Sequence, residues 1–401
     1  MALEVAPTLS VRPDEFVHVG PDTLGGRYLR QFWQPVYLAH ELPIGRAVPL
    51  RILGEDLTLY RGHGGAPHLL AFRCAHRGTQ LSTGWVEGDN LRCFYHGWTY
   101  APNGQCVEQP AEPRPFCERI KIKSYPTREY LGLVFAYLGD RAGRPQEATS
   151  EHETGDGRRD EPPPFPRYAQ LEGEGVLETH SYLRECSYFN SIENNMDEAH
   201  IAFVHRSSQF SDAGLTNFLP EISGEETEYG IIRRGTRANG TVRILHLVMP
   251  NLLVFKGAPA PESGGKEEPD QFAWRVPVDD LTHRSFNVSF VRLTGQAAER
   301  YRERMGTRQG DSANELAWSV LRGELRVGDI TGRPDIVNIQ DVVAQVGQGQ
   351  IPDRANERLG QSDVMIVLLR KIWMRELQAL FEGLALKQWA MAGRLDSAFG
   401  V

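Results

Sequence analysis

The chain has 401 residues, of which 44 are Lys or Arg and 52 are Asp or Glu, giving a formal net charge of -8. This length predicts roughly two or three domains, and the acidic balance argues against nucleic acid as the main partner. The amino terminus has no basic segment followed by an apolar one, and no apolar run reaches membrane-spanning length. We therefore expect a cytoplasmic protein that does not bind a membrane.

The sequence pattern of the first third of the chain predicts β-strands. Short apolar or alternating runs broken by Gly and Pro are typical of strands joined by turns. These runs lie at 48–53, 57–60, 69–72, 91–94, 120–122 and 131–138. The pattern predicts an antiparallel β domain over residues 35–145.

Two Cys/His pairs lie in this region. Cys74-Ala-His76 and Cys93-Phe-Tyr-His96 each supply one thiol and one imidazole, and we expect them at the tips of two hairpins. Two thiolates can bind one iron of a two-iron, two-sulfur cluster while two imidazoles bind the other, as in a Rieske centre. Zinc also accepts two sulfurs and two nitrogens, but zinc sites usually group Cys with Cys and His with His. The mixed loops therefore favour an electron-carrying cluster.

Further along, the composition changes. Residues 139–166 are rich in Gly, Pro, Glu, Asp and Arg, which predicts a linker or surface loop at 146–166. Beyond it we expect a helix at 187–204, strands within 231–255 and 272–293, and a final helix that begins at Asp363 after a Ser362 cap. This second region, 167–401, is predicted to be α+β.

A second concentration of reactive side chains lies in the predicted helix 187–204. On a helix His200 shares a face with Asp197, and His205 can reach the same point if the helix bends or ends near it. Two imidazoles and one carboxylate form the facial triad that leaves positions open on non-haem Fe(II). Such a histidine pair alone is more often structural, but the cluster motif upstream favours a metal site.

These segments carry a family resemblance. Residues 74–78 and 93–98 resemble the two cluster loops of the Rieske family, and residues 194–205 resemble the mononuclear-iron motif of Rieske non-haem iron oxygenases, phthalate-type branch. The resemblance implies Cys74, His76, Cys93 and His96 as cluster ligands and His200 and His205 as iron ligands. It also implies that Asp197 links a neighbouring subunit's cluster ligand, His96 or His76, to this iron.

The resemblance spans nearly the whole chain and implies its organisation. We expect an α+β protein in which the antiparallel β Rieske domain, 35–145, precedes a helix-grip-like catalytic domain, 167–401, with an antiparallel sheet and helices. Residues 1–34 are expected to form an N-terminal segment that packs on the catalytic domain.

The third iron ligand must be a distant carboxylate. Residues 359–370 resemble the segment that supplies the ligating aspartate in the phthalate-type branch, so Asp363 is the first choice. Alternatively, Asp363 only stabilises the positive end of the helix that it begins. Asp341 is the second choice, and Glu357 is a more remote one.

Two metals imply a reaction, because cleavage of dioxygen at mononuclear iron needs electrons that a Rieske cluster can supply. The sequence has no Gly-rich dinucleotide-binding turn and no plant-type ferredoxin motif. We therefore expect a separate reductase, with or without a ferredoxin, to deliver electrons from NADH. The resemblance implies a homotrimer in which electrons pass between subunits.

The family resemblance also suggests the substrate. The phthalate-type branch acts largely on aromatic compounds, and the chain resembles oxygenase components of lignin-derived biaryl O-demethylases within it, so we expect oxidative O-demethylation of a methoxylated aromatic acid. Aromatic ring cis-dihydroxylation is the alternative reaction, and a Rieske electron-transfer protein without oxygenase activity is the alternative class. Arg184, Arg206 or Lys256 could meet a substrate carboxylate, although solvated surface is the commoner role for such residues.

Overall fold

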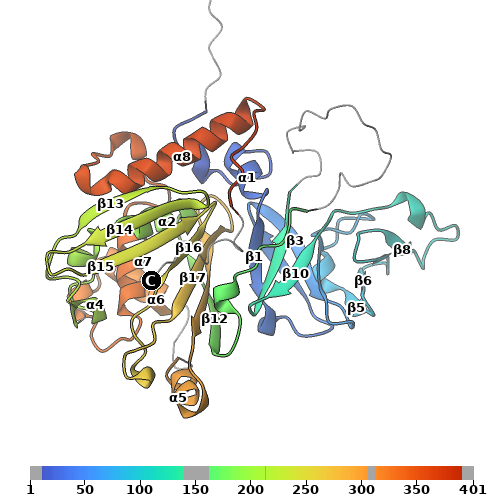
Figure 1. Cartoon of the computed structure of the whole chain (residues 1–401). Helices are drawn as coiled ribbons and strands as arrows, with labels where there is room; N and C mark the ends of the chain where they lie inside the picture. The colour runs from blue at the N-terminus through green and yellow to red at the C-terminus, as the bar shows by residue number, and fades with distance from the viewer. Residues whose placement is uncertain (1–10, 140–161, 213, 306–311, 391–401) are drawn as a thin grey trace, which may run out of the picture.

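The computed structural model describes residues 11–139, 162–212, 214–305 and 312–390. They form two β-rich regions that lie side by side, with the amino-terminal region on the right and the carboxy-terminal region on the left in Figure 1. Most of the predicted linker, 146–166, falls outside the described residues, which resume at 162. Residues 1–10 of the expected N-terminal segment also fall outside them.

The first region contains three small antiparallel sheets, with strand orders β1-β11-β10, β2-β3-β4-β9 and β5-β6-β7-β8. Their strands are β1 Trp33–Leu38, β2 Ala47–Ile52, β3 Glu55–Arg61, β4 Pro67–Ala71, β5 Trp85–Glu87, β6 Asn90–Arg92, β7 Thr99–Tyr100, β8 Cys106–Glu108, β9 Ser124–Tyr125, β10 Thr127–Tyr130 and β11 Leu133–Tyr137. The loop that holds Cys93 joins β6 to β7, as expected for a hairpin. The loop that holds Cys74 is closed by an isolated bridge between Arg73 and Gln80 and by further backbone hydrogen bonds.

The second region is built on one antiparallel sheet of seven strands in the order β12-β18-β17-β16-β15-β14-β13. The strands are β12 Val176–Arg184, β13 Glu221–Glu226, β14 Gly230–Thr236, β15 Val242–Val248, β16 Leu252–Lys256, β17 Asp270–Pro277 and β18 His283–Val291. Strands β13 to β18 follow one another as a meander, and β12 pairs with the last of them. Because each strand pairs with its neighbour in regular register, one face of the sheet presents alternate residues of every strand.

Helices flank this sheet. They are α1 Leu24–Leu29, α2 Tyr188–Met196, α3 Ile201–Val204, α4 Gln209–Asp212, α5 Gly295–Met305, α6 Ser312–Leu321, α7 Ile336–Gly347 and α8 Val364–Phe381. Helix α8 runs along the top of the second region in Figure 1, close to α1, whereas α6 and α7 lie behind the sheet in this view. Among the residues that the structure describes, no helix combines the length and apolar character needed to cross a membrane.

The predicted helix at 187–204 is interrupted. Helix α2 ends at Met196, because Asp197 has an extended backbone with ψ 114°. The Asp197 carboxylate then accepts hydrogen bonds from the backbone N–H groups of Ala199 at 2.7 Å and His200 at 3.3 Å. A side chain that caps the next turn in this way competes with continuation of the helix, and the chain changes direction before α3.

The main hydrophobic core is continuous across both regions. Phe135 of β11 packs edge-on against Trp274 of β17, with ring centroids 5.7 Å apart. The N-terminal segment joins the same core, since Phe16 stacks on Phe189 of α2 at 4.0 Å and Tyr28 packs against Trp373 of α8. A second, smaller core lies beneath the cluster loops, and its buried members are Tyr60, Leu70, Cys74, Leu81, Leu91, Cys93, Trp98, Tyr100, Cys106 and Ile122.

Candidate metal centres

The two Cys/His loops have the same backbone design. The N–H of Gly78 donates to the carbonyl of Cys74 at 2.9 Å, and the N–H of Gly97 donates to the carbonyl of Cys93 at 3.1 Å. Both glycines have positive φ, 76° and 75°, a conformation that side-chain-bearing residues adopt only at a cost. Each loop therefore closes tightly and presents its thiol and imidazole to the same space.

The ligand side chains of these loops lie together. Both cysteines are buried, and the rings of His76 and His96 have centroids 4.5 Å apart. Trp98 stacks on His76 at 4.7 Å with an interplanar angle of 6°. The Nδ1 atom of His76 is buried without a hydrogen-bond partner, which is costly for a polar atom unless a ligand completes its environment. The four side chains fit a two-iron, two-sulfur cluster.

Tyr100 supplies a polar contact to this site. Its hydroxyl lies 3.1 Å from Sγ of Cys74 and accepts a hydrogen bond from the backbone N–H of Ala75 at 3.0 Å. Burial raises the pKa of Tyr100, so the phenol keeps its proton and can donate it to the sulfur. Hydrogen bonds to cluster sulfurs stabilise added negative charge and raise the reduction potential.

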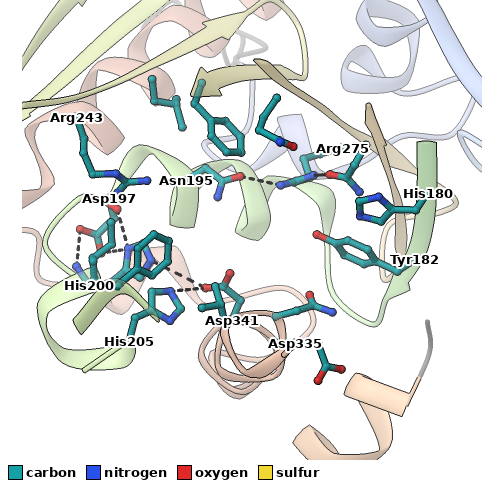
Figure 2. A pocket seen from close by; sticks show the side chains of 18 of the residues that line it. His180, Tyr182, Asn195, Asp197, His200, His205, Arg243, Arg275, Asp335 and Asp341 are labelled. Atoms are coloured by element: carbon teal, nitrogen blue, oxygen red, sulfur yellow. Dashed lines mark hydrogen bonds and ion pairs between the residues drawn. The ribbon is translucent and has the colours of Figure 1, made fainter. Parts of the chain in front are cut away.

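The second centre combines two histidines of one segment with a carboxylate of another (Figure 2). His205 Nε2 lies 3.3 Å, and His200 Nε2 lies 3.9 Å, from Oδ1 of Asp341 on helix α7. All three ligand atoms lie within 4.8 Å of one another. The break after α2 makes this possible, because it lets α3 carry both imidazoles toward α7.

Hydrogen bonds orient the two imidazoles for metal binding. Nδ1 of His205 lies 2.9 Å from Oε1 of Gln340, and Nδ1 of His200 lies 2.7 Å from the carbonyl oxygen of Asp197. Both oxygens are acceptors, so each Nδ1 carries the proton and each Nε2 is free to bind a metal. Although burial opposes it, the two histidines lower the pKa of Asp341, and its buried Oδ1 has no hydrogen-bond partner. The three residues fit a mononuclear metal ion with open positions.

Asp363 does not join this group, so the first choice for the third ligand is corrected to Asp341. The Asp363 carboxylate accepts a hydrogen bond from the N–H of Gly360 at 2.7 Å, immediately before α8. Asp363 stands at the N-cap position of α8 but makes no side-chain capping hydrogen bond to that helix, since its carboxylate bonds back across the short 3-10 turn Gln361–Asp363. Ser362 is not the cap residue. Glu357 is also excluded, because it pairs with Arg370 at 2.7 Å.

Sequence reasoning missed α7, which carries the third carboxylate. Its apolar residues recur at helical spacing, and Asn338, Asp341 and Gln345 interrupt them at intervals of three and four. This polar stripe was the available signal, because residues at these intervals share one helix face. Asn338 and Gln345 use that face to bind the buried Arg184, at 2.5 and 3.1 Å.

A buried charge cluster fixes the turn between α2 and α3. Glu198 is fully buried and its carboxylate binds the guanidinium groups of Arg233, Arg237 and Arg243. These arginines come from β14, the turn after it and β15. A Cβ atom at Gly235 of β14 would lie only 2.4 Å from Cγ of Glu198, so the glycine leaves room for the carboxylate. The cluster attaches the ligand-bearing turn to the sheet, and sequence reasoning did not find it.

The iron-site residues open onto a cavity of about 550 Å³, a size typical of small-molecule sites. One part of its wall is apolar, formed by Phe210, Leu245 and Phe255. Another part, on strands β12, β17 and β18, is polar. The remaining lining residues include Glu178, Thr179, His180, Ser181, Tyr182, Asn195, Ile201, Gln271, Arg275, Asn287, Met305, Val337 and Asn338.

Comparison with known proteins shows which family the chain belongs to. Residues 32–126 match the family model of the Rieske [2Fe-2S] domain. The alpha subunit of phenoxybenzoate dioxygenase from Ectopseudomonas oleovorans is 31% identical over 387 residues, which cover 91% of this chain and 84% of that protein. The oxygenase subunit of 5,5'-dehydrodivanillate O-demethylase from a Sphingobium species is 29% identical over 389 residues, 92% of this chain and 80% of that protein.

A solved structure shows the same fold. The terminal oxygenase of carbazole 1,9a-dioxygenase from a Novosphingobium species superposes with a TM-score of 0.62 and 23% identity, covering 94% of this chain and 96% of that one. The chain belongs to the Rieske non-haem iron oxygenases, and it is an oxygenase subunit. The predicted α+β fold, the enzyme class and the cofactors, a Rieske cluster and a mononuclear iron, are thereby confirmed.

Proposed function

We propose that this oxygenase removes the methyl group of a methoxylated aromatic acid. The observation that carries the proposal is the convergence of His200 Nε2, His205 Nε2 and Asp341 Oδ1 at the wall of a cavity that also has an apolar part. An aromatic ring fits against Phe210, Leu245 and Phe255, which places a ring substituent toward the metal ligands. The named substrates of two relatives, phenoxybenzoate and 5,5'-dehydrodivanillate, are aromatic carboxylates, which supports the same class for this chain.

The reaction inserts one oxygen atom of dioxygen into a methyl C–H bond. The resulting hemiacetal breaks its C–O bond to give a phenol and formaldehyde, while the other oxygen atom takes two electrons and two protons to form water. Bound Fe(II) and the Rieske cluster together supply dioxygen activation and electrons. His200, His205 and Asp341 would hold the iron, and Cys74, His76, Cys93 and His96 would hold the cluster.

The remaining side chains orient and shield these groups. Gln340 and the carbonyl of Asp197 fix the two imidazoles through their Nδ1–H groups. Such outer contacts typically change metal affinity or activity by about 10- to 100-fold. The apolar part of the wall excludes water from the space beside the ligands, which strengthens polar interactions within it.

Electron transfer is placed between subunits in this proposal. Strands β5, β6 and β8, from the sheet that carries the Cys93 loop, lie at one edge of the molecule, whereas α4 and α7 lie toward the opposite edge (Figure 1). The side chain of Asp197 is 24% exposed, so a neighbouring subunit can reach it. A homotrimer that brings His96 or His76 of one subunit to Asp197 of the next would complete the path.

The source of electrons and the cellular location are part of the same proposal. NADH provides electrons through a separate reductase, with or without a ferredoxin. A cytoplasmic location is supported by the five cysteines, all within the described residues, because none of them forms a disulfide, as is usual in reducing compartments.

Single-turnover chemistry tests the reaction without the unidentified reductase. Holoenzyme is reduced with dithionite, freed of reductant and mixed with dioxygen and a methoxylated benzoate or biphenyl carboxylate. We expect formaldehyde and the matching phenol, and neither product from an Asp341→Ala variant. A cis-diol without formaldehyde across the panel would replace demethylation by the alternative, ring dihydroxylation.

A further inference from the structure

The polar part of the cavity wall is organised by strand register. Ser285 of β18 pairs with Tyr182 of β12 on one side and with Arg275 of β17 on the other. Directly paired residues point to the same face of a sheet, so the three side chains form a row. Serine is small, and the longer side chains of Tyr182 and Arg275 extend over it into the cavity. Both line the cavity, and Figure 2 shows them across it from His200 and His205.

The guanidinium of Arg275 is buried without a counter-ion. The residue is only 6% exposed, and its Nη atoms donate to the amide oxygens of Asn195 at 3.0 Å and Asn287 at 3.4 Å. Its Nε–H has no hydrogen-bond partner. Within the described part of the chain, no carboxylate oxygen lies within 4.0 Å of it. A buried charge in this state is costly unless a partner neutralises it.

Four other cationic side chains of the second region either pair with a carboxylate or lie outside the cavity wall. Arg233 and Arg243 both bind the carboxylate of Glu198. Arg184, one of the basic residues considered from the sequence, is also buried, but it binds Asn338 and Gln345 and does not line the cavity. Lys256 pairs with Asp270 at 2.7 Å. Arg275 therefore lines the cavity and carries a positive charge that no carboxylate of the described residues neutralises.

The same positive charge acts on the phenol of Tyr182. Burial alone would raise the pKa of its phenol, but the guanidinium groups of Arg275 and Arg184 lower it below its ordinary value. An acidified hydroxyl is a better hydrogen-bond donor to an anion. The wall thus offers a guanidinium and a phenolic O–H on adjacent positions of one row.

We propose that Arg275 and Tyr182 bind the carboxylate of the aromatic substrate. The inference rests on the proposed function and names the residues that select an acid. A guanidinium has five N–H donors, and Asn195 and Asn287 occupy two of them, which leaves donors for a two-point contact with a carboxylate. The hydroxyl of Tyr182 adds a third contact. With the carboxylate held here, the opposite end of the ring points toward His200, His205 and Asp341.

This arrangement also rejects neutral compounds. A ligand that fills the cavity displaces the water that solvates Arg275, and only an anion replaces that solvation. A primary amide of the same shape would leave the charge unneutralised. The row therefore acts as a specificity determinant for acids over neutral analogues.

Calorimetric binding to anaerobic holoenzyme tests the assignment. The probes are 3-methoxybenzoate, 4-hydroxy-3-methoxybenzoate and a methoxylated biphenyl carboxylate, each paired with its primary amide. We expect wild type to prefer at least one acid over its amide by about tenfold or more. Arg275→Gln keeps a polar side chain of similar length without the charge, and should weaken acid binding about 10- to 100-fold while changing amide binding little.

Two further variants are controls. They test whether a change in acid binding comes from misfolding or from a general change in the electrostatic potential of the protein. Tyr182→Phe preserves the ring and should weaken acid binding by a smaller factor than Arg275→Gln. Arg284→Gln removes a positive charge next to Ser285 on the opposite face of the sheet, since Arg284 lines a different pocket, and should leave the ratio of acid to amide affinity unchanged. Iron content and the Rieske spectrum report whether each variant is folded.

The outcomes separate this inference from the proposed reaction. If no acid binds more tightly than its amide, or if Arg275→Gln and Tyr182→Phe both retain the wild-type preference, the carboxylate site is wrong. Formaldehyde release from the methoxylated amides in the same experiments would then leave O-demethylation standing. Acid-selective binding without formaldehyde from any probe would instead retain the carboxylate site and count against the demethylase.

Discussion

The cluster loops and the mononuclear iron site bring their ligands together by different routes. All four proposed cluster ligands lie within residues 74–96, on two loops with the same backbone hydrogen bonds and the same positive-φ glycines. The proposed iron site takes His200 and His205 from one interrupted helix and Asp341 from another helix far along the chain. The first site is specified by local turns, and the second depends on how α7 packs beside α3.

The two sites also differ in how they are supported. The cluster loops rest on a small core of their own, which includes Trp98 and Tyr100. The iron site rests on a buried charge cluster around Glu198 and on polar contacts from α7. Substitutions should therefore damage one site without the other, and the following experiments test that separation.

The largest effect is expected from loss of the distant carboxylate. Asp341→Ala removes an iron ligand, so we expect the mononuclear iron to be lost and product formation to fall by more than about 100-fold, beyond the range for outer contacts. The Rieske spectrum should be unchanged, because no cluster ligand is altered. Iron analysis and electron paramagnetic resonance measure both. Asp363→Ala is the matched control; loss of iron from it, with iron retained in Asp341→Ala, would reverse the assignment.

The link between the sites is tested by Asp197→Asn. Asparagine keeps an acceptor oxygen for the N–H groups of Ala199 and His200 but removes the charge and the second carboxylate oxygen. Both metals should stay bound, while NADH-driven or reductant-driven turnover falls by about 100-fold. Normal product formation with full metal content would remove Asp197 from the electron path.

A stability effect confined to the iron site is expected from Glu198→Gln. The change leaves the buried Arg233 and Arg237 and the partly exposed Arg243 around a neutral amide, and breaking a buried ion pair from one side costs about 3–5 kcal/mol. Chemical denaturation and iron retention measure the loss. Glu225→Gln, which removes an exposed carboxylate paired with Arg234 at 3.3 Å, should change stability little. Equal stability of the two variants would contradict the role given to the cluster.

The smallest expected effect is a shift in the reduction potential of the Rieske cluster. Tyr100→Phe removes the hydroxyl that lies 3.1 Å from Sγ of Cys74. A hydrogen bond of about 1 kcal/mol corresponds to roughly 40 mV for a one-electron couple, so the Rieske potential should fall by about this amount. A spectroscopic redox titration measures it, with iron content unchanged. A potential equal to or above that of wild type would show that the hydroxyl does not donate to the sulfur.

These differences explain what the sequence could predict. The cluster motif and the His200 and His205 pair are visible because their residues are close in sequence and chemically distinctive. The helix break at Asp197 was missed, since it depends on that side chain capping the next turn. Asp363 was preferred to Asp341 because residues 359–370 resemble the segment that supplies the ligating aspartate in the phthalate-type branch. Only tertiary packing, which one sequence does not show, brings Asp341 to the two histidines.

The substrate wall was harder still to anticipate. Arg184 and Lys256 drew attention as cations, but the structure gives both of them partners. Arg275 becomes distinctive only when the register of three strands sets it beside Tyr182 and its lack of a counter-ion becomes visible. Whether an arginine has a counter-ion is decided by the folded structure, so the sequence alone does not show it.

The continuous core has a mechanical consequence. The packing of Phe135 on Trp274 and of the N-terminal segment on α2 and α8 joins the two regions through apolar contacts. Regions that swing independently are usually joined by small, polar interfaces, so we expect these two to move as one body. The position of the cluster relative to the rest of its chain is then set once, at folding. Turnover would be timed by the arrival of substrate and electrons, and not by a hinge.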